Sequence, residues 1–368
     1  MQLVKTQRDT LLRPLQVVSG IVERRHTLPI LANILIRKDG EKVSFLSTDI
    51  EVQITTHANV GSGSEVAATT VAARKLLDIL RALPDSGGVT LTMANKRMTV
   101  QSGKSRFALQ TLAAEEFPTV QQAEHFNAKV TLPQKTLKHL FNMVHFSMAQ
   151  QDIRYYLNGL LLVVDGKNVI AVATDGHRLA FCQVETDQDF ARQEVIIPRK
   201  TILELQRLLE DNDNTVDLEI ANNQVKLTFA DIELISKLVE GKFPDYTRVI
   251  PKGYKNNFTI DRQQLLHSLQ RAAIMTSDKF KGVRCIISPG SLKISSTNAD
   301  QEEAVEELEI DYGGDSVDIG FNVTYLLDVL NNLKGDSINI ALGDANSSAL
   351  ITVPENVDFK YVVMPMRI

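Results

Sequence analysis

The sequence predicts an α+β protein made of three similar domains, each with two helices packed on antiparallel sheets. Two observations predict this fold. A repeat of about 125 residues runs through the chain, and helix-like and strand-like apolar patterns recur in the same order within each repeat. A chain of 368 residues is also too long for one core. We expect domains at residues 1–125, 126–252 and 253–368.

The repeat is clearest in three helical stretches, at residues 71–84, 196–210 and 321–334. A spacing of 125 residues links Leu77, Ile202 and Leu327, and it recurs three and six positions further along. Apolar residues at this interval fall on one side of a helix, so each stretch predicts a helix with one buried stripe. Earlier in each unit, leucine pairs predict another helix, around Leu11, Leu137 and Leu265.

A short polar turn between apolar strands is the second repeated feature. Its plainest copy is Ala173–Leu179, where Asp175 and Gly176 predict a tight turn between two strands. Shorter copies lie at Ser47–Asp49 and Ser296–Asn298. Alternating strands follow the second helix of each unit, and units one and two both end in Phe-Pro, at residues 117–118 and 243–244. Linkers are expected near residues 119–127 and 248–256.

Composition excludes several classes of protein. The apolar content is 43%, and no apolar run approaches the roughly 20 residues of a membrane-spanning helix. The first residues lack the apolar stretch of a signal peptide. The two cysteines, Cys182 and Cys285, fit no metal-binding spacing. We therefore expect a cytoplasmic protein with buried thiols, no membrane association, no metal site and no cofactor.

Charge is unevenly distributed along the chain, whose net charge is −5. Residues 1–125 carry 15 Lys and Arg against 12 Asp and Glu, whereas residues 253–368 carry 10 against 16. The acidic run Asp300–Asp311 contains no basic residue, and Lys96, Arg97, Lys104 and Arg106 complement it. A solvated surface is the alternative. We favour a head-to-tail contact, which in a soluble protein closes into a ring.

Basic residues also lie on the predicted helices, as Arg74, Lys75 and Arg81, and as Arg199, Lys200 and Arg207. They are either solvated or, if the helices share one surface, form a positive wall that attracts phosphates without reading sequence. No zinc spacing or helix-turn-helix signature favours sequence-specific recognition.

Longer motifs carry a resemblance to a known family. They are Thr27–Leu31, Gln151–Gly159, Ala173–Leu179, Ser236–Val239, Phe243–Tyr246, Gly320–Val323 and Tyr361–Ile368. Over its whole length the sequence resembles the bacterial sliding clamp, the β subunit of the DNA polymerase III holoenzyme. Ile368 replaces a terminal Leu. The resemblance implies a head-to-tail homodimer, a ring of six domains that encircles duplex DNA, opens by a loader ATPase, and gives the polymerase processivity without catalysis.

The resemblance further implies a pocket that accepts short linear peptides from the polymerase III α subunit, the clamp loader, other polymerases and repair proteins. Its expected walls are Leu157, Thr174, Gly176, His177, Arg178, Leu179, Pro244, Arg248, Val249, Val362, Val363, Met364, Pro365, Met366 and Arg367. Met and Val suit an adaptable apolar groove, Gly176 allows close approach of a peptide, and the arginines can bond its carbonyl or acidic groups.

Two further sets of positions follow from the resemblance. The DNA-contacting set is Arg25, Gln151, Tyr155, Tyr156 and Lys200, to which charge and position add Arg74 and Arg199. The dimer set comprises Phe107, Leu109, Ile274 and Met275, with Lys75, Lys104 and Arg106 facing Glu302, Glu303, Glu306 and Glu307. Lys104 stands where the family has Arg, and Lys lacks the two-pronged contact that Arg makes with a carboxylate.

Two other functional classes compete with the clamp. Asp175 and His177 suggest acid–base chemistry, and Ser147 or Ser236 a nucleophile, but His177 has no orienting partner visible in the sequence and no hydrolase or phosphate-loop motif is present. A repeat-built scaffold that binds only proteins is the other alternative. Such a scaffold has no need for Arg or Lys on matching helices of separate units.

Overall fold

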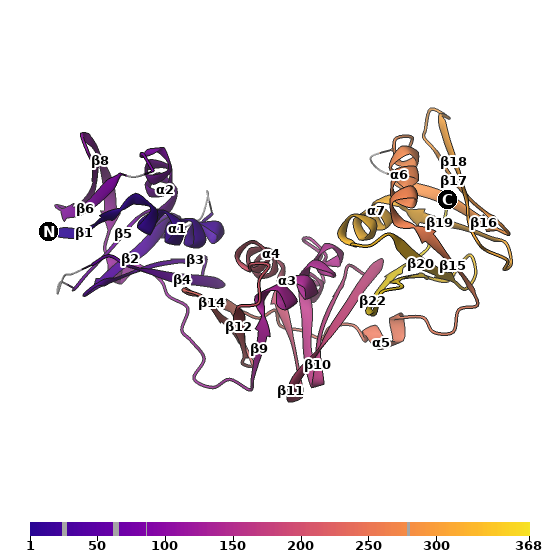
Figure 1. Cartoon of the computed structure of the whole chain (residues 1–368), viewed down its shortest axis with the longest axis horizontal. Helices are drawn as coiled ribbons and strands as arrows, with labels where there is room; N and C mark the ends of the chain where they lie inside the picture. The colour runs from indigo at the N-terminus through magenta and orange to yellow at the C-terminus, as the bar shows by residue number, and fades with distance from the viewer. Residues whose placement is uncertain (24–27, 62–65, 86, 278–279) are drawn as a thin grey trace. The chain divides into compact units, whose positions relative to one another are not determined.

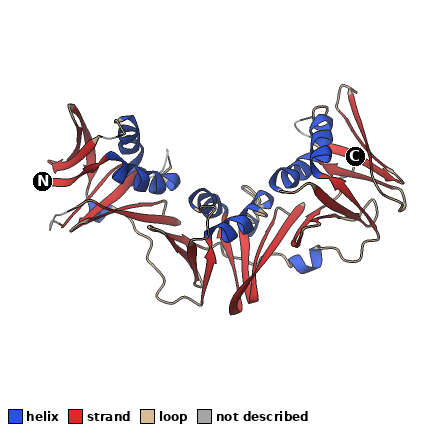
Figure 2. Ribbon diagram, in the orientation of Figure 1, coloured by secondary structure: helices blue, strands red, loops and turns tan. Residues whose placement is uncertain are grey.

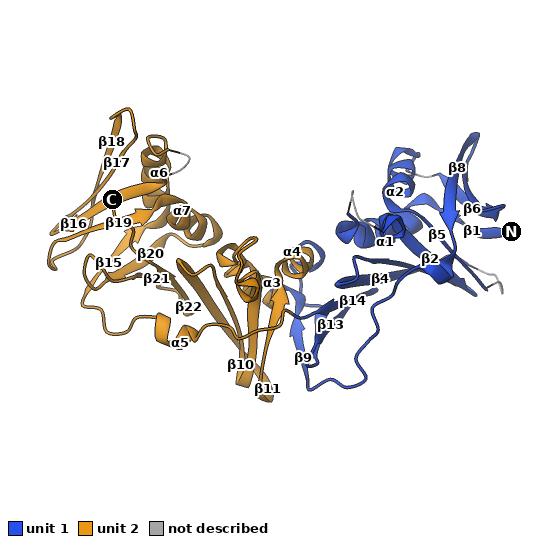
Figure 3. Cartoon of the chain, turned by 180° about the vertical axis from the view of Figure 1, so that it is seen from behind, with its two compact units in different colours: residues 1–135, 207–238 blue, residues 136–206, 239–368 orange. Residues whose placement is uncertain are grey.

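The computed structural model describes residues 1–23, 28–61, 66–85, 87–277 and 280–368. It contains two compact units (Figure 3). Unit 1 comprises residues 1–135 and 207–238, and unit 2 comprises residues 136–206 and 239–368. These units cut across the predicted repeats because strands of neighbouring repeats pair with one another: β4 with β14 in unit 1, and β11 with β22 in unit 2.

Unit 1 is built on a 12-stranded sheet, in the order β1-β6-β7-β8-β5-β2-β3-β4-β14-β13-β12-β9 (Figure 1). Its strand pairings among the described residues are antiparallel. The strands are β1 (Gln2–Gln7), β2 (Asn33–Asp39), β3 (Lys42–Thr48), β4 (Val52–Asn59), β5 (Val66–Ala72), β6 (Gly88–Ala94), β7 (Arg97–Ser102), β8 (Ser105–Leu112), β9 (Ala128–Pro133), β12 (Thr215–Ile220), β13 (Gln224–Phe229) and β14 (Ile232–Lys237). The helices are α1 (Arg8–Val18) and α2 (Ala73–Ala82), with 3-10 turns η1 (Ser19–Ile21), η2 (Pro29–Ala32) and η3 (Ala114–Glu116).

Unit 2 contains a six-stranded sheet, β10-β11-β22-β21-β20-β15, and a four-stranded sheet, β18-β17-β16-β19. Its strands are β10 (Gly159–Thr174), β11 (Arg178–Pro198), β15 (Asn256–Asp261), β16 (Gly282–Ser288), β17 (Ser291–Thr297), β18 (Glu303–Glu309), β19 (Val317–Asn322), β20 (Ser337–Leu342), β21 (Ala349–Val353) and β22 (Asn356–Val363). Its helices are α5 (Tyr246–Val249), α6 (Arg262–Ala273), α7 (Val323–Asn332) and the 3-10 turns η4 (His145–Ser147) and η5 (Tyr155–Leu157). The ends of α3 (Gln134–Asn142) and α4 (Arg199–Leu208) extend into unit 1.

The predicted helices are confirmed. Within each unit they gather on one side of the strands (Figure 2). Leu80, Leu205 and Leu330 are all buried, as the repeated stripe requires. One repeated contact was not predicted from the sequence. Arg8 at the start of α1 donates to the Leu83 carbonyl after α2 at 3.0 Å, and Arg262 at the start of α6 donates to the Leu330 carbonyl in α7 at 2.8 Å. A cation there satisfies carbonyls at a helix C-terminus.

The repeated turn is also confirmed, down to its hydrogen bonds. In the first two copies a Thr hydroxyl, of Thr48 or Thr174, accepts from the amide two residues on and donates to the carbonyl four residues on. The following carboxylate, of Asp49 or Asp175, accepts from the amides two and three residues on. Such side-chain bonds replace the missing ladder bonds of a turn. The two copies therefore share one local structure.

Long strands flank the central turn. The apolar runs Leu160–Val164 and Val169–Ala173 belong to a single 16-residue strand, β10, which pairs with the 21-residue β11. The register shifts on both sides of Gly166, whose φ of +56° places it in the left-handed region. A bulge thus joins the two runs.

Both cysteines are buried and free, as expected, and burial raises the pKa of each thiol, Cys182 and Cys285, to about 12. Among the residues that the structure describes, no helix has the length and apolar character needed to cross a membrane. The same residues contain no cluster of three or more His, Cys, Asp or Glu suited to a metal ion.

Candidate functional site

The pairing of β22 with β11 brings the end of the chain beside the central turn. Leu179 lies opposite Val362 and Arg178 opposite Val363 in the register. The Met364 amide continues this contact by donating to the His177 carbonyl at 2.9 Å. Residues nearly 190 positions apart in the sequence therefore form one continuous edge.

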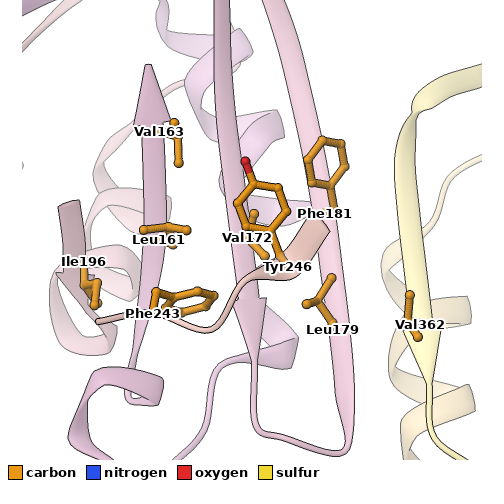
Figure 4. Close-up of a cluster of buried hydrophobic side chains, with 9 residues drawn as sticks. All are labelled: Leu161, Val163, Val172, Leu179, Phe181, Ile196, Phe243, Tyr246 and Val362. Carbon is orange, nitrogen blue, oxygen red and sulfur yellow. The ribbon is translucent and has the colours of Figure 1, made fainter. Parts of the chain in front are cut away.

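One face of this pairing is apolar. Side chains alternate between the faces of a strand, so Leu179 and Val362 share a face. Phe243 and Tyr246, from the segment after β14, pack on that face (Figure 4). The buried cluster comprises Leu161, Val163, Val172, Leu179, Phe181, Ile196, Phe243, Tyr246 and Val362. Asp245 caps the short helix α5 that follows by accepting from the Thr247 amide. The cluster thus fixes the position of α5 beside the turn.

The predicted pocket residues divide into a buried floor and an exposed rim. Leu157, Thr174, Leu179 and Val362 form the buried set. The exposed set is Gly176, His177, Pro244, Arg248, Val249, Met364 and Arg367, with Pro365 and Met366 partly buried. Val249 and Met364 are 43% and 49% exposed, which is high for large apolar side chains on a folded chain. We call this set of residues, the predicted peptide site, the α5 groove.

Arg178 occupies a different place from the one expected. Its side chain points to the opposite face from Leu179, where it contacts Asp175 at 3.1 Å and Asp328 of α7 at 2.5 Å and lies 4.5 Å above the Tyr325 ring. Burial by itself lowers the pKa of Arg178, but the Tyr361 hydroxyl and the two carboxylates more than offset it, so the pKa is raised. Arg178 therefore holds the turn to α7, and its expected contact with a peptide stays a prediction. Val363 is likewise fully buried behind the sheet.

Arg154 supports the turn from outside and was not predicted as a site residue, although it lies within the motif Gln151–Gly159. Its guanidinium donates to both carboxylate oxygens of Asp152, at 3.0 and 2.9 Å, and to the Asp175 carbonyl at 3.2 Å. These hydrogen bonds hold the pKa of Asp152 at about 2. Gly176 has φ +89°, and a Cβ there would lie 3.0 Å from Arg154 Nη1. This backbone conformation favours glycine, and a Cβ at position 176 would also force the end of the Arg154 side chain to shift.

A polar cleft of about 540 Å³ lies on the helix side of the turn. Its lining includes His145, His177, Arg178, Arg199 and Tyr325. Burial lowers the pKa of Arg199, and the nearby Arg178 charge lowers it further. Burial also lowers the pKa of His145. No acid–base pair with a nucleophile is assembled among these described residues, and the buried Ser147 hydroxyl has no hydrogen-bond partner.

Comparison with known proteins identifies the family. Models of the N-terminal, central and C-terminal domains of the DNA polymerase III beta subunit match residues 1–121, 131–245 and 247–367.

The chain belongs to the DNA polymerase III β subunit family.

Curated and structural relatives of this β subunit family agree over nearly the full length. The beta sliding clamp of Pseudomonas aeruginosa is 44% identical over 365 residues, covering 98% of this chain and 99% of the relative. That of Escherichia coli is 43% identical over 362 residues, with the same coverage. A P. aeruginosa sliding clamp solved with griselimycin has a TM-score of 0.96 at 43% identity, and Caulobacter crescentus pol III beta has 0.94 at 35%, each with complete coverage of both chains.

The dimer positions taken from the β subunit family lie on or near β8, inside the 12-stranded sheet, and β18, at the end of the four-stranded sheet. On the β8 side, Lys104, Arg106 and Phe107 are exposed, and Leu109 is only 9% exposed and so belongs to the core of the free chain. Lys75 is exposed on α2. On the β18 side, the exposed positions are Glu302, Glu303 and Glu307, and Ile274 after α6 is 73% exposed while Met275 is half-buried. Glu306 already pairs with Arg271 of α6 at 2.6 Å, so it has a partner within the chain.

The expected DNA positions, five taken from the β subunit family and Arg74 and Arg199 added for their charge and position, lie on several elements. Arg25 lies outside the described residues. Arg74 is exposed on α2, and Arg199 and Lys200 begin α4 half-buried. Gln151 is exposed with φ +57°, and Tyr155 is 60% exposed. Tyr156 packs against the apolar cluster of the α5 groove, which places it on the groove side.

Proposed function

We propose that the chain is a sliding clamp that encircles duplex DNA in the cell interior, the bacterial cytoplasm, and tethers the replicative polymerase. One observation carries the proposal: models of all three β-subunit domains match in order along the chain. The role is that of a non-catalytic processivity subunit, in which residues 1–125, 126–252 and 253–368 act as three domains. Family membership gives no support to a scaffold that binds proteins alone.

The ring requires a head-to-tail dimer, and the edges of two sheets supply suitable surfaces. Between residues 105 and 109, β8 pairs on one side only, with β7, and β18 pairs only with β17 among the described residues. Unpaired strand edges accept another strand through main-chain hydrogen bonds. Phe107 is 37% exposed and Val305 of β18 is 49% exposed. Basic residues accompany the first edge and acidic residues the second, so the two attract one another.

The α5 groove suits a short peptide from a polymerase, the clamp loader or a repair protein. Apolar side chains of a peptide would pack on the exposed rim of Val249 and Met364, which the buried floor supports and which would adapt to different ligands. Arg248 is the cation at this rim: its side chain is 87% exposed, and its 3.1 Å contact with Asp245 is weak enough to exchange for a ligand acid. A clamp ligand such as griselimycin is expected to occupy this groove.

Contact with DNA is proposed to be loose and independent of sequence. Lys and Arg side chains attract phosphates without discriminating bases, and affinity then falls steeply with salt. The overall charge of −5 limits adhesion to DNA elsewhere on the molecule. A closed ring stays on DNA because it encircles the duplex, so it needs no stronger contact with the DNA.

Retention on DNA of different topology tests the proposal. The chain is loaded by a clamp loader onto a nicked circular plasmid and isolated by gel filtration, and the plasmid is then linearised. A clamp stays on the circle and leaves the linear form. Equal loss from both forms, or a monomeric mass by sedimentation at micromolar concentration, would refute encirclement.

A further inference from the structure

The first two repeats meet in unit 1 at a junction that copies the backbone of the α5 groove. Gln53 lies opposite Thr48 in β3 and opposite Ile235 in β14. Leu179 lies likewise opposite Thr174 and Val362. The Lys237 amide donates to the Glu51 carbonyl at 2.9 Å, as the Met364 amide does to the His177 carbonyl. Gln53 therefore occupies the position of Leu179.

An apolar floor is present at this junction too. Leu35, Leu46 and Phe117 form a buried cluster, with Ile30 packed against it. The residues 126 positions later belong to the apolar cluster of the α5 groove or pack against it. Leu35 corresponds to Leu161, Leu46 to Val172, Phe117 to Phe243, and Ile30 to Tyr156. The backbone and the floor of a groove are thus repeated in both places.

The two junctions differ in what covers the floor. At the first junction the chain's own linker is bound through its main chain: Gln53 Oε1 accepts from the Val120 amide at 2.8 Å, and Gln224 Oε1 accepts from the Ala123 amide at 2.6 Å. Gln224 Nε2 also donates to the Gln121 carbonyl at 2.9 Å. Both glutamine side chains are buried, 6% and 4% exposed.

The linker has the exposure pattern of a bound extended peptide. Val120 and Ala123 are partly buried, whereas Gln121 and Gln122 between them are exposed. The counterpart of Val120, 126 residues later, is Tyr246, which starts α5. Leu179 has no polar atom with which to bond a linker amide, so there the chain folds into a capped helix and leaves its rim open.

We propose that the first junction is a second peptide groove, and that residues 119–123 of the chain itself are its occupant. Gln53 and Gln224 hold this segment through three main-chain hydrogen bonds. A salt bridge between Lys237 and Glu51 at 3.2 Å stands where Met364 and His177 form the open rim. A peptide able to occupy it must be extended and must compete with the linker. The identity of the site as a peptide groove rests on the proposed function of the α5 groove.

Hydrogen–deuterium exchange and ligand stoichiometry test the proposal with purified full-length chain. The double variant Gln53→Leu/Gln224→Ala removes both side-chain acceptors of the linker amides. The matched control is Gln16→Leu, at an exposed position of α1. Loss of a buried hydrogen bond should speed exchange of residues 119–124 about tenfold while β9 and β12 are unchanged. Adding Lys237→Met restores the apolar rim, and calorimetry should then give two griselimycin molecules per chain, against one for the unaltered chain.

Each result bears on a separate step. Unchanged exchange in residues 119–124 would show that the glutamines do not hold the linker, and overturns the proposal. Faster exchange with a stoichiometry still at one would show that the floor beneath does not accept a peptide, and also overturns it. Absence of griselimycin binding to the unaltered chain instead contradicts the proposed function of the α5 groove. If the triple variant loses its normal melting transition, Gln53→Leu alone supplies the exchange measurement.

Discussion

Replacing Asp328 with Ala should loosen the turn that forms one wall of the α5 groove. Arg178 is 9% exposed and is balanced by two carboxylates, Asp175 at 3.1 Å and Asp328 at 2.5 Å. Removing one partner of a buried ion pair costs roughly 3–5 kcal/mol. Asp175 remains, and the Asp328 side chain is 34% exposed, so we discount the cost to about 2 kcal/mol. At about 1.4 kcal/mol per tenfold change, local opening becomes roughly 30-fold more frequent.

Amide exchange measures this change without requiring the whole chain to unfold in one step. The reporter is residues 178–182 of β11, which pair with β22, and the internal reference is residues 2–7 of β1 in unit 1. Asp318→Ala is the matched control, because Asp318 also pairs with an arginine, Arg284, but both side chains are about half exposed. An exposed pair contributes roughly 0.2–1 kcal/mol, which is at most about fivefold.

Equal effects of the two variants on β11 exchange would contradict the role given to Arg178. So would a change of less than about threefold for Asp328→Ala, since that corresponds to the strength of a surface pair. Asp328→Asn keeps the shape and one acceptor, and should give an intermediate rate. Griselimycin affinity should fall in the same order as exchange rises.

Other perturbations test separate parts of the structure. Ile50 has φ +78°, a conformation that costs a residue with a branched Cβ about 1–2 kcal/mol; Ile50→Asn should therefore slow exchange in β3 and β4, whereas Ile50→Val should not. Burial holds the pKa of His145 below its usual 6.5, so the unfolded chain takes up a proton first as pH falls; stability should decrease from about pH 7 downward, and His145→Gln should flatten that dependence in melting curves. Deleting Met364–Ile368 removes the Met364 wall and the Met366 amide bond to Gly320, so griselimycin binding should vanish in calorimetry while sedimentation still gives a dimer; unchanged affinity would place the ligand elsewhere.

Local sequence patterns predict many of the helices and turns. Leu80, Leu205 and Leu330 predict buried helix stripes because an α-helix places every third or fourth residue on one side, and all three are buried. The turns are equally local. The Thr and Asp side chains bond main-chain amide and carbonyl groups within four residues, so these hydrogen bonds of the motif are local.

Side-chain direction across the sheets was less predictable. Alternation shows that Arg178 and Leu179 face opposite ways, but not which face holds α7 and which holds Phe243. That choice places Arg178 beside Asp328, which is 150 residues distant in the chain. Gln53 and Gln224 were invisible for the same reason: their partners are linker amides, 67 and 101 residues away, and a glutamine in a strand has no pattern of its own.

The sequence by itself determined the class of protein: a threefold α+β repeat, basic toward its start and acidic toward its end, whose motifs follow one family throughout. The apolar periodicity and the charge distribution are properties of the sequence and do not depend on the tertiary structure. The tertiary structure decided how the copies of the repeated turn differ. Beside Leu179 it placed the chain's terminal residues and an open rim; beside Gln53 it placed the linker. The physical reason is the polarity of one side chain: glutamine at this position bonds a main-chain amide of the linker, whereas leucine packs into a buried apolar cluster.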